Sequence, residues 1–309
     1  MNWISNKILE EYQVRKTKKQ KTRFIEFIKE NIPYAKVEQG GFSDNRNIVV
    51  GDVAKAEVVF TAHYDTCAVL PFPNFIMPKN ILFSVLYSVL ICIPFIVVIM
   101  LMNHLLGYIT DDFYIHYFVS LFLFIGLFLL VFIFGIPNKH TANDNTSGVV
   151  ALCELMFSMS SEERSRYAFV FFDNEENGLF GSAYFRKIHK NQMKNKLLIN
   201  MDCVGDGDNL LIVESKPARR KYGECLRKAF SDNENIKVHF EKSSTTYYPS
   251  DQAGFPLGVA IAAVKRSRIL GLYMDRIHTR RDTICEEKNI GYLVESLRAF
   301  LSVLDKYKK

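Results

Sequence analysis

Residues Phe169–Gly181 read Phe-Val-Phe-Phe-Asp-Asn-Glu-Glu-Asn-Gly-Leu-Phe-Gly and join a strand pattern to two adjacent carboxylates. An apolar run of strand-forming residues, 167–172, leads into Glu175 and Glu176, and a turn with glycine follows. Open α/β sheets bind their ligands in the crevice outside the carboxyl ends of the strands. Two neighbouring carboxylates repel each other unless a positive charge lies between them. The stretch therefore predicts either an exposed acidic loop or a strand that delivers both carboxylates to a functional site.

Short apolar segments with the pattern of strands alternate with helical segments on both sides of this stretch. The predicted strands are 47–50, 57–61, 167–172, 197–200, 210–213, 238–240 and 257–264. The predicted helices are about 5–31, 149–159, a helix from about 182, 219–231 and 289–307. This alternation predicts an α/β fold with a mixed, largely parallel sheet flanked by helices.

Composition and charge narrow the classes of function. The net charge of +6 at pH 7 is modest and the basic residues form no stripe interleaved with aromatics, so we expect no nucleic-acid partner. The six cysteines are scattered without a Cys-x-x-Cys pair, which predicts neither a disulfide framework nor a thiolate zinc site and fits a reducing compartment. The first residues lack the apolar core of a signal peptide, so we do not expect export by that route.

The first predicted helix carries a cluster of positive charges. Its basic residues are Arg15, Lys16, Lys18, Lys19, Lys21 and Arg23. They predict either a solvated helix face or a contact with anionic lipid.

Two long apolar stretches, 81–102 and 113–136, interrupt the α/β pattern and contain no Asp, Glu, Lys or Arg. Each exceeds the ~18 apolar residues that indicate a transmembrane helix. Pro94 is tolerated within such a helix. The alternative, two buried core helices, requires a core larger than the remaining chain can build. We therefore predict a transmembrane hairpin at 79–138 that divides one domain into a first part, 1–78, and a second part, 139–309.

The charges that flank the hairpin predict its orientation. Lys79 and Lys139 lie at its outer ends, whereas the connecting loop carries Asp111 and Asp112 and no Lys or Arg. Cytoplasmic loops carry an excess of Lys and Arg. The protein is therefore expected in a membrane with two helices, and its soluble parts are expected on the cytoplasmic side.

Residues that commonly bind metals lie at several predicted strand ends and loops. They are His63, Asp144, Glu175, Glu176, Asp202 and His278. Imidazole nitrogen and carboxylate oxygen without thiolate suit Zn²⁺ in a catalytic site. Five ligands that share one carboxylate hold two metals roughly 3.5–4 Å apart in hydrolytic sites, and a sixth group then remains free to act as a base.

These motifs resemble the zinc-dependent exopeptidases typified by bacterial leucyl aminopeptidase, aminopeptidase Y and glutamate carboxypeptidase, metallopeptidase family twenty-eight. The blocks that carry the resemblance follow in order: Thr61-Ala62-His63-Tyr64-Asp65-Thr66, Ala142-Asn143-Asp144-Asn145-Thr146-Ser147-Gly148, Phe172-Asp173-Asn174-Glu175-Glu176-Asn177-Gly178, Asn200-Met201-Asp202 and Ile277-His278-Thr279. The resemblance covers nearly all of the chain outside the hairpin and implies the zinc exopeptidase fold.

The resemblance also implies roles for individual residues. One zinc ion would be held by His63, Asp144 and Asp202, and a second by Asp144, Glu176 and His278, with Asp144 as the bridge. Glu175 would be the general base for attack by a water that bridges the two metals. Asp65 would orient the imidazole of His63.

Four further residues near these blocks are candidates for roles at the site. Tyr247 or Tyr248 is a candidate donor to the oxyanion of the reaction. Gln252 stands where the family usually has histidine in a Ser-Asp-His block. Asp282 would either orient His278 or be a surface charge.

The resemblance predicts a membrane-anchored aminopeptidase with two zinc ions that acts on short peptides. The hairpin replaces a short loop of the relatives next to His63 and Asp144, so we expect the active site close to the bilayer and substrates that emerge from it. One alternative is a glutaminyl-cyclase-like acyltransferase with one zinc ion. The other is a non-catalytic membrane scaffold on a peptidase fold.

Overall fold

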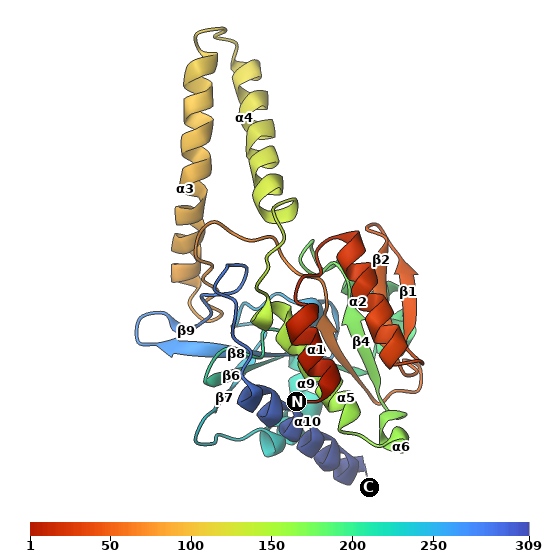
Figure 1. The fold of residues 1–309 in the computed structure, drawn as a ribbon. Coiled ribbons are helices and arrows are strands. Elements are labelled where there is room, and N and C mark those ends of the chain that lie inside the picture. The colour runs from red at the N-terminus through yellow and green to blue at the C-terminus, as the bar shows by residue number, and fades with distance from the viewer. Residues whose placement is uncertain (309) are drawn as a thin grey trace.

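A nine-stranded sheet runs through residues 1–308, the part of the chain that the computed structural model describes (Figure 1). Its strands are β1 (Lys36–Gly40), β2 (Asn45–Val50), β3 (Val58–His63), β4 (Ala168–Phe172), β5 (Leu197–Met201), β6 (Asn209–Glu214), β7 (Lys237–Lys242), β8 (Gly258–Ser267) and β9 (Gly271–Tyr273). The strand order is β1-β2-β4-β3-β5-β8-β6-β7, and β9 pairs with β8.

The centre of the sheet, β4-β3-β5-β8, is parallel, and antiparallel pairs such as β1–β2 and β6–β8 lie to either side of it. Every residue of β3, β4 and β5 is buried, as expected for parallel strands covered on both faces. The predicted α/β class, a mixed and largely parallel sheet flanked by helices, is confirmed. Because β3, β4 and β5 run in the same direction, their carboxyl ends meet at one edge of the sheet.

Helices cover both faces of the sheet. The larger hydrophobic cluster joins one face to α1 (Trp3–Glu11), α2 (Lys18–Asn31), α5 (Gly148–Phe157), α9 (Lys216–Ala229) and α10 (Glu287–Lys308). The second cluster joins the other face to α7 (Phe180–Ile188) and α8 (Lys190–Met193), and the short helix α6 (Ser161–Arg164) precedes β4. The central strands β3, β4 and β5 are therefore closed to solvent on both faces, and their carboxyl ends are the part of them that loops can reach.

The N-terminal region differs from the single helix predicted at about 5–31. It forms two helices, because Thr17 caps α2 through a capping box with Gln20. The link between α1 and α2 carries Arg15 into the interior, where it has no exposed surface, and the side chain of Lys21 on α2 is also buried. Neither a solvated face nor a lipid contact therefore describes these two basic residues.

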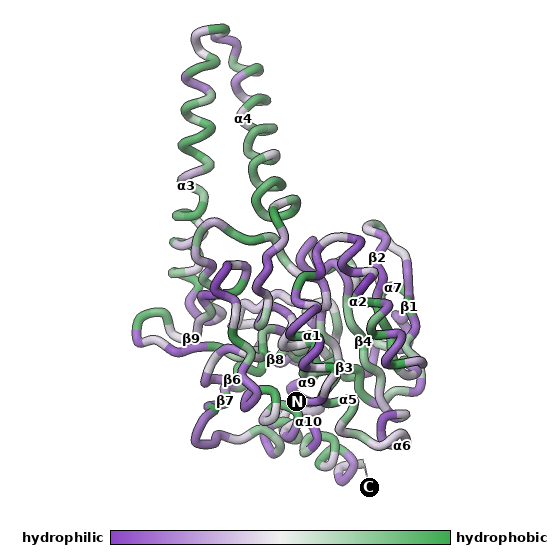
Figure 2. The backbone as a smooth tube through the Cα atoms, in the orientation of Figure 1, coloured by the Kyte–Doolittle hydropathy of each residue, from purple (hydrophilic) through white to green (hydrophobic). Residues whose placement is uncertain are grey.

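The two apolar stretches form a helical hairpin that projects from the rest of the molecule (Figure 1). It consists of α3 (Ile81–Leu106) and α4 (Phe113–Phe128), which a π-helical turn, η1 (Leu129–Ile133), extends. Figure 2 shows that hydrophobic residues cover most of both helices. Neither helix has a buried residue, so the alternative of two core helices is wrong. Both are long and apolar enough to cross a membrane.

The two ends of the hairpin segment meet at the base. Ala68 and Pro137 form a β-bridge, and the N–H of Val69 donates to the oxygen of Ile136 at 2.8 Å. At the far end, Asn103 of α3 donates to Ser120 of α4 at 2.6 Å. The hairpin is thus inserted between β3 and α5, directly above the edge where β3, β4 and β5 end.

Candidate metal centre

The structure brings together all six residues predicted as ligands or base. His63 is the last residue of β3, Asp202 follows β5, and Glu175 and Glu176 follow β4. Asp144 lies in the turn η2 (Ala142–Ser147) before α5, and His278 lies in the loop after β9. Segments more than 200 residues apart in sequence, such as those of His63 and His278, therefore meet at one edge of the sheet.

Asp144 lies between two sets of side chains. Its Oδ1 is 3.4 Å from Nε2 of His63, which is 3.5 Å from Oδ1 of Asp202. Its Oδ2 is 2.8 Å from Nε2 of His278, which is 3.3 Å from Oε2 of Glu176. The two oxygens of one carboxylate thus face two different groups of possible ligands.

The chemistry of these side chains fits divalent metal ions. The possible ligand atoms form groups within 4.8 Å of one another, among them His63 with Asp144 and Glu176, and His63 with Glu175 and Asp202. Two buried carboxylate oxygens, Oε1 of Glu176 and Oδ1 of Asp202, accept no hydrogen bond. A buried acceptor without a partner costs about 1–3 kcal/mol. Imidazole nitrogens, carboxylates and unpaired buried oxygens together are the donor set that Zn²⁺ uses in catalytic sites.

Burial and mutual repulsion change the protonation of this acidic cluster. Burial opposes a charge on His278, yet Glu176 and Asp144 raise its pKa to about 9. Burial likewise opposes a charge on Asp144, yet His278 and His63 hold its pKa below the ordinary value. Burial, with repulsion from Glu176 and Asp251, raises the pKa of Glu175 well above the ordinary value. The cluster is thus an anionic site that favours added positive charge.

Asp65 connects His63 to the Glu175–Glu176 turn. Its main-chain oxygen lies 3.1 Å from Nδ1 of His63, which leaves Nε2 facing the carboxylates of the cluster. Its side-chain oxygens accept the backbone N–H groups of Glu175 at 3.0 Å and Glu176 at 3.2 Å. The main-chain oxygen of Asp65 thus makes the shorter contact with the imidazole, and Oδ1 of Asp65 also lies 3.6 Å from Nδ1 of His63. The same carboxylate fixes the turn that carries the two glutamates.

Asp282 supports Asp144 and not His278. Its two oxygens accept the backbone N–H groups of Asn143 at 2.8 Å and Asp144 at 3.0 Å. The side chain is buried, so a surface charge is also the wrong description. Burial, with repulsion from Asp144, raises the pKa of Asp282 to about 8.

Two buried cations lie behind the acidic loops, and the sequence analysis did not assign them to the site. Arg15 donates through Nε to the oxygen of Tyr64, and through Nη1 to the hydroxyl of Thr146 at 3.1 Å. Lys21 forms an ion pair with Asp173 at 2.6 Å, next to the Glu175–Glu176 turn. A signal for Lys21 was present, because it lies three residues before the core residue Phe24 and so shares its helix face.

The two tyrosines named as oxyanion donors differ in their surroundings. Tyr248 is buried and its hydroxyl donates to the main-chain oxygen of Asp202 at 3.2 Å. Tyr247 is 69% exposed, and both tyrosines line the cavity above the cluster. Gln252 donates to the oxygen of Tyr248 at 2.9 Å and accepts from Asn200 at 3.2 Å, so it links this loop to β5.

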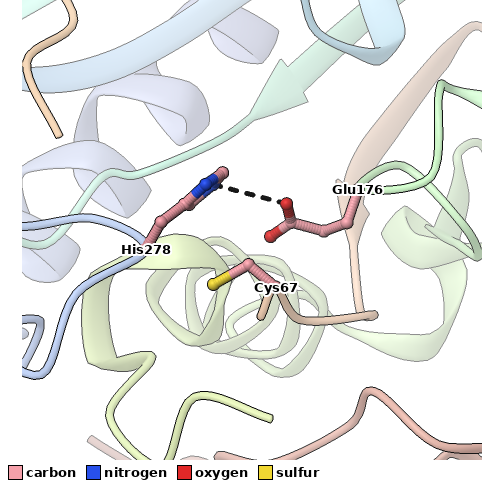
Figure 3. A group of neighbouring side chains, drawn as sticks. All are labelled: Cys67, Glu176 and His278. Atoms are coloured by element: carbon pink, nitrogen blue, oxygen red, sulfur yellow. Dashed lines mark ion pairs between the residues drawn. The ribbon is translucent and has the colours of Figure 1, made fainter. Parts of the chain in front are cut away.

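Cys67 lies beside one half of the cluster (Figure 3). Its sulfur is within 4.8 Å of the nearest ligand atoms of Glu176 and His278, a proximity that the scattered cysteine pattern did not predict. Burial and the nearby carboxylates raise the pKa of its thiol well above the ordinary value. Asn138 donates to the sulfur at 4.0 Å, so Cys67 is held as a packed thiol within the described structure.

A sequence profile and several solved structures resemble this chain. The sequence profile described as Peptidase family M28 matches residues 132–294, which include all the possible ligands except His63. No curated protein sequence matches the chain.

Solved structures share the fold at low sequence identity. LapA aminopeptidase of Legionella pneumophila has a TM-score of 0.56 and 13% identity, over 97% of this chain and 68% of that chain. LapB of the same organism has a TM-score of 0.57 and 15% identity, over 98% and 70%. Glutaminyl cyclase of Porphyromonas gingivalis has a TM-score of 0.58 and 14% identity, over 97% and 95%. At these identities, the likeness shows a common fold.

Proposed function

The chain belongs to peptidase family M28, and we propose that it is a membrane-anchored aminopeptidase with two zinc ions, which removes N-terminal residues from short peptides. The observation that carries this proposal is the position of Asp144, whose oxygens lie 3.4 Å from His63 on one side and 2.8 Å from His278 on the other. A shared carboxylate between two ligand sets is what a pair of metals requires.

These distances support the assignment of metal ligands that the family resemblance implies. One ion would be bound by His63, Asp144 and Asp202, and the other by Asp144, Glu176 and His278. Zinc bound there supplies a Lewis acid for the peptide carbonyl and lowers the pKa of water.

Glu175 is the proposed general base. Its carboxylate lies in the group with His63 and Asp202, and its main chain is held by Asp65. In hydrolysis, it accepts a proton from the attacking water as the new C–O bond forms. It then gives that proton to the amine nitrogen as the C–N bond breaks. Tyr247 is the better placed oxyanion donor, since the hydroxyl of Tyr248 already donates to Asp202.

Metal content and turnover, measured on the full chain in lipid nanodiscs, test this proposal. The substrates are a panel of aminoacyl-anilides and a peptide with N-terminal glutamine. We expect two metals per chain and hydrolysis that falls by about 10²–10⁴-fold in Glu175→Gln while the metals stay bound. The control is Glu162→Gln on the exposed helix α6, which should behave like the wild type.

A second candidate activity is supported by the likeness to glutaminyl cyclase, which this chain matches over 95% of that protein. Such an enzyme would need one zinc ion and would cyclise the N-terminal glutamine with release of ammonia. One metal per chain with cyclisation and no anilide hydrolysis would replace the aminopeptidase proposal. Metal-free protein without turnover would favour a non-catalytic scaffold.

We also propose that residues 79–138 are a membrane hairpin inserted into one catalytic domain made of 1–78 and 139–309. The long apolar helices α3 and α4, exposed along their length, support the anchoring. The bridge between Ala68 and Pro137 supports an insertion whose ends meet. The charges of the hairpin favour a cytoplasmic catalytic domain, because its base carries Lys79 and Lys139 whereas its tip carries two aspartates.

A further inference from the structure

The cavity above the metal cluster is bounded on one side by the membrane hairpin. It has a volume of about 310 Å³, and the side chains of the cluster line it. Ser84, Tyr87, Ser88 and Ile91 of α3 line it as well. A helix with the composition of a membrane span is thus a wall of the proposed active site.

The four lining residues of α3 lie on one helix face, since they are spaced three, four and seven positions apart. Phe95 continues this face and contacts Phe124 of α4 and Phe132 of η1, each at a ring-centroid distance of 6.4 Å. Ile91 and Phe95 are half-buried, whereas Leu90 on another face of the helix is 59% exposed. Beyond Ile91 this face of α3 packs against the other helix of the hairpin, and the two helices diverge toward the sheet in Figure 1.

Contacts with the segment before α3 hold this wall in place. The hydroxyl of Tyr87 donates to the oxygen of Pro73, and its ring packs edge-on against Phe75 at 5.4 Å. Ser84 donates to the oxygen of Met77 at 3.2 Å, and Ser88 donates to the oxygen of Ser84 at 2.9 Å. Because these hydroxyls are already bonded to the main chain, the wall offers a ligand mainly apolar surface.

The lining of the cavity thus combines charged and apolar side chains. None of the α3 residues in the lining is charged, whereas the carboxylates and imidazoles of the cluster also line the cavity. An apolar surface recognises apolar groups by removing them from water. A peptide suits this lining when its free amino end and scissile bond reach the cluster and its next residues are apolar.

We propose that α3 is the specificity wall of the site and that the enzyme takes peptides whose residues directly after the N-terminal one are apolar. This inference rests on the proposed aminopeptidase function. The apolar segment of such a peptide lies along Ser88 and Ile91 in the cavity, and the packing of Phe95 against Phe124 and Phe132 covers the helix face beyond them. Ile91 is the residue on which the preference depends most, because it is the one aliphatic side chain that α3 contributes to the described lining.

Two peptides with the same N-terminal residue and the same length test the inference on the full chain in nanodiscs. One continues with leucine and valine, and the other with glycine and serine. We expect the wild type to prefer the apolar peptide by at least about tenfold in kcat/KM, mainly through KM. Ile91→Ala should reduce this preference about three- to tenfold, mainly through a higher KM for the apolar peptide.

The matched control is Leu90→Ala, which removes the same kind of side chain from a more exposed face of the helix and should keep the full preference. It also corrects for partitioning of the apolar peptide into lipid, which both variants share. Zinc content and turnover of the polar peptide show that each variant is folded. A wild type that hydrolyses both peptides equally, or an Ile91→Ala variant indistinguishable from Leu90→Ala, would overturn the inference while the aminopeptidase function stands.

Binding of a fluorescent form of the apolar peptide provides a readout that does not need turnover. We expect weaker binding by Ile91→Ala than by Leu90→Ala in the zinc-loaded protein. If neither peptide is hydrolysed and this difference in binding persists, the aminopeptidase function fails and the apolar wall stands. If neither peptide is hydrolysed and the two variants bind equally, both proposals fail.

Discussion

Among single residues, Asp144 and its supports determine what the site can bind. Asp282 holds the main chain at Asn143 and Asp144, and Asp65 holds the main chain at Glu175 and Glu176. Groups that fix the ligands of a metal typically change its affinity 10- to 100-fold when they are mutated. The two supporting aspartates therefore belong to the site, although neither is a proposed ligand.

The protonation of His278 predicts how metal affinity depends on pH. In the metal-free protein its pKa is raised from 6.5 to about 9 by Glu176 and Asp144 against the effect of burial, so it is protonated at pH 7. Binding requires the neutral imidazole, and zinc must displace this proton. Deprotonation of His278 alone should therefore contribute up to about a tenfold rise in affinity per pH unit below about pH 9, and this contribution should end above that pH.

Zinc titration calorimetry at pH 7, in buffers with different heats of ionisation, measures this proton release. We expect about one proton fewer to be released by His278→Ala than by the wild type. The control, His189→Ala, replaces a histidine that pairs with Glu38 outside the cluster and should release as many protons as the wild type. Equal release by wild type and His278→Ala would contradict the assignment.

Among the elements, the link between α1 and α2 has an unexpected structural role. It places Arg15 beneath the loops of Tyr64 and Thr146. There the positive charge of the guanidinium compensates part of the negative charge of Asp65 and Asp144. Removal of one partner from a buried charged network costs about 3–5 kcal/mol. Arg15→Met should therefore lower the free energy of unfolding by about that amount.

Urea unfolding in detergent, followed by circular dichroism, measures the loss. Arg23→Met on α2 is the matched control, since its side chain is 62% exposed and its pair with Glu11 is long at 3.4 Å. Exposed ion pairs contribute about 0–1 kcal/mol, so this variant should unfold close to the wild type. Equal stability of the two variants would mean that buried Arg15 does not stabilise the fold more than exposed Arg23 does.

For the whole molecule, the proposed orientation places the hairpin tip and the catalytic domain on opposite sides of the membrane. Two cysteine variants test this orientation. Thr110→Cys places a thiol in the loop between α3 and α4, and Lys139→Cys places one at the base of the hairpin. In intact cells, we expect a membrane-impermeant maleimide to label the first and not the second, because only the tip is exposed outside. Labelling of Lys139→Cys alone would reverse the orientation, and labelling of both only after lysis would exclude a membrane span.

Local pattern was sufficient for much of the fold and of the candidate site. The strands before His63, Glu175 and Asp202 were predictable because an apolar run followed by a metal-binding residue is a short-range feature. The long exposed apolar helices were predictable because their length and lack of charge need no partner to be recognised. These features depend only on residues close together in the chain.

Contacts between distant segments decided the rest, and no local pattern contains them. Arg15 and Thr146 are 131 residues apart, and Asp282 and Asn143 are 139 apart, yet each pair is hydrogen-bonded. The same holds for Ile91 of α3, which an apolar pattern marks only as lipid-facing and which the fold places on the wall of the cavity. Whether a charged side chain is buried depends on the segments that pack around it, because its desolvation and its pairing depend on neighbours in three dimensions. The same neighbours decide which face of a helix lines a cavity.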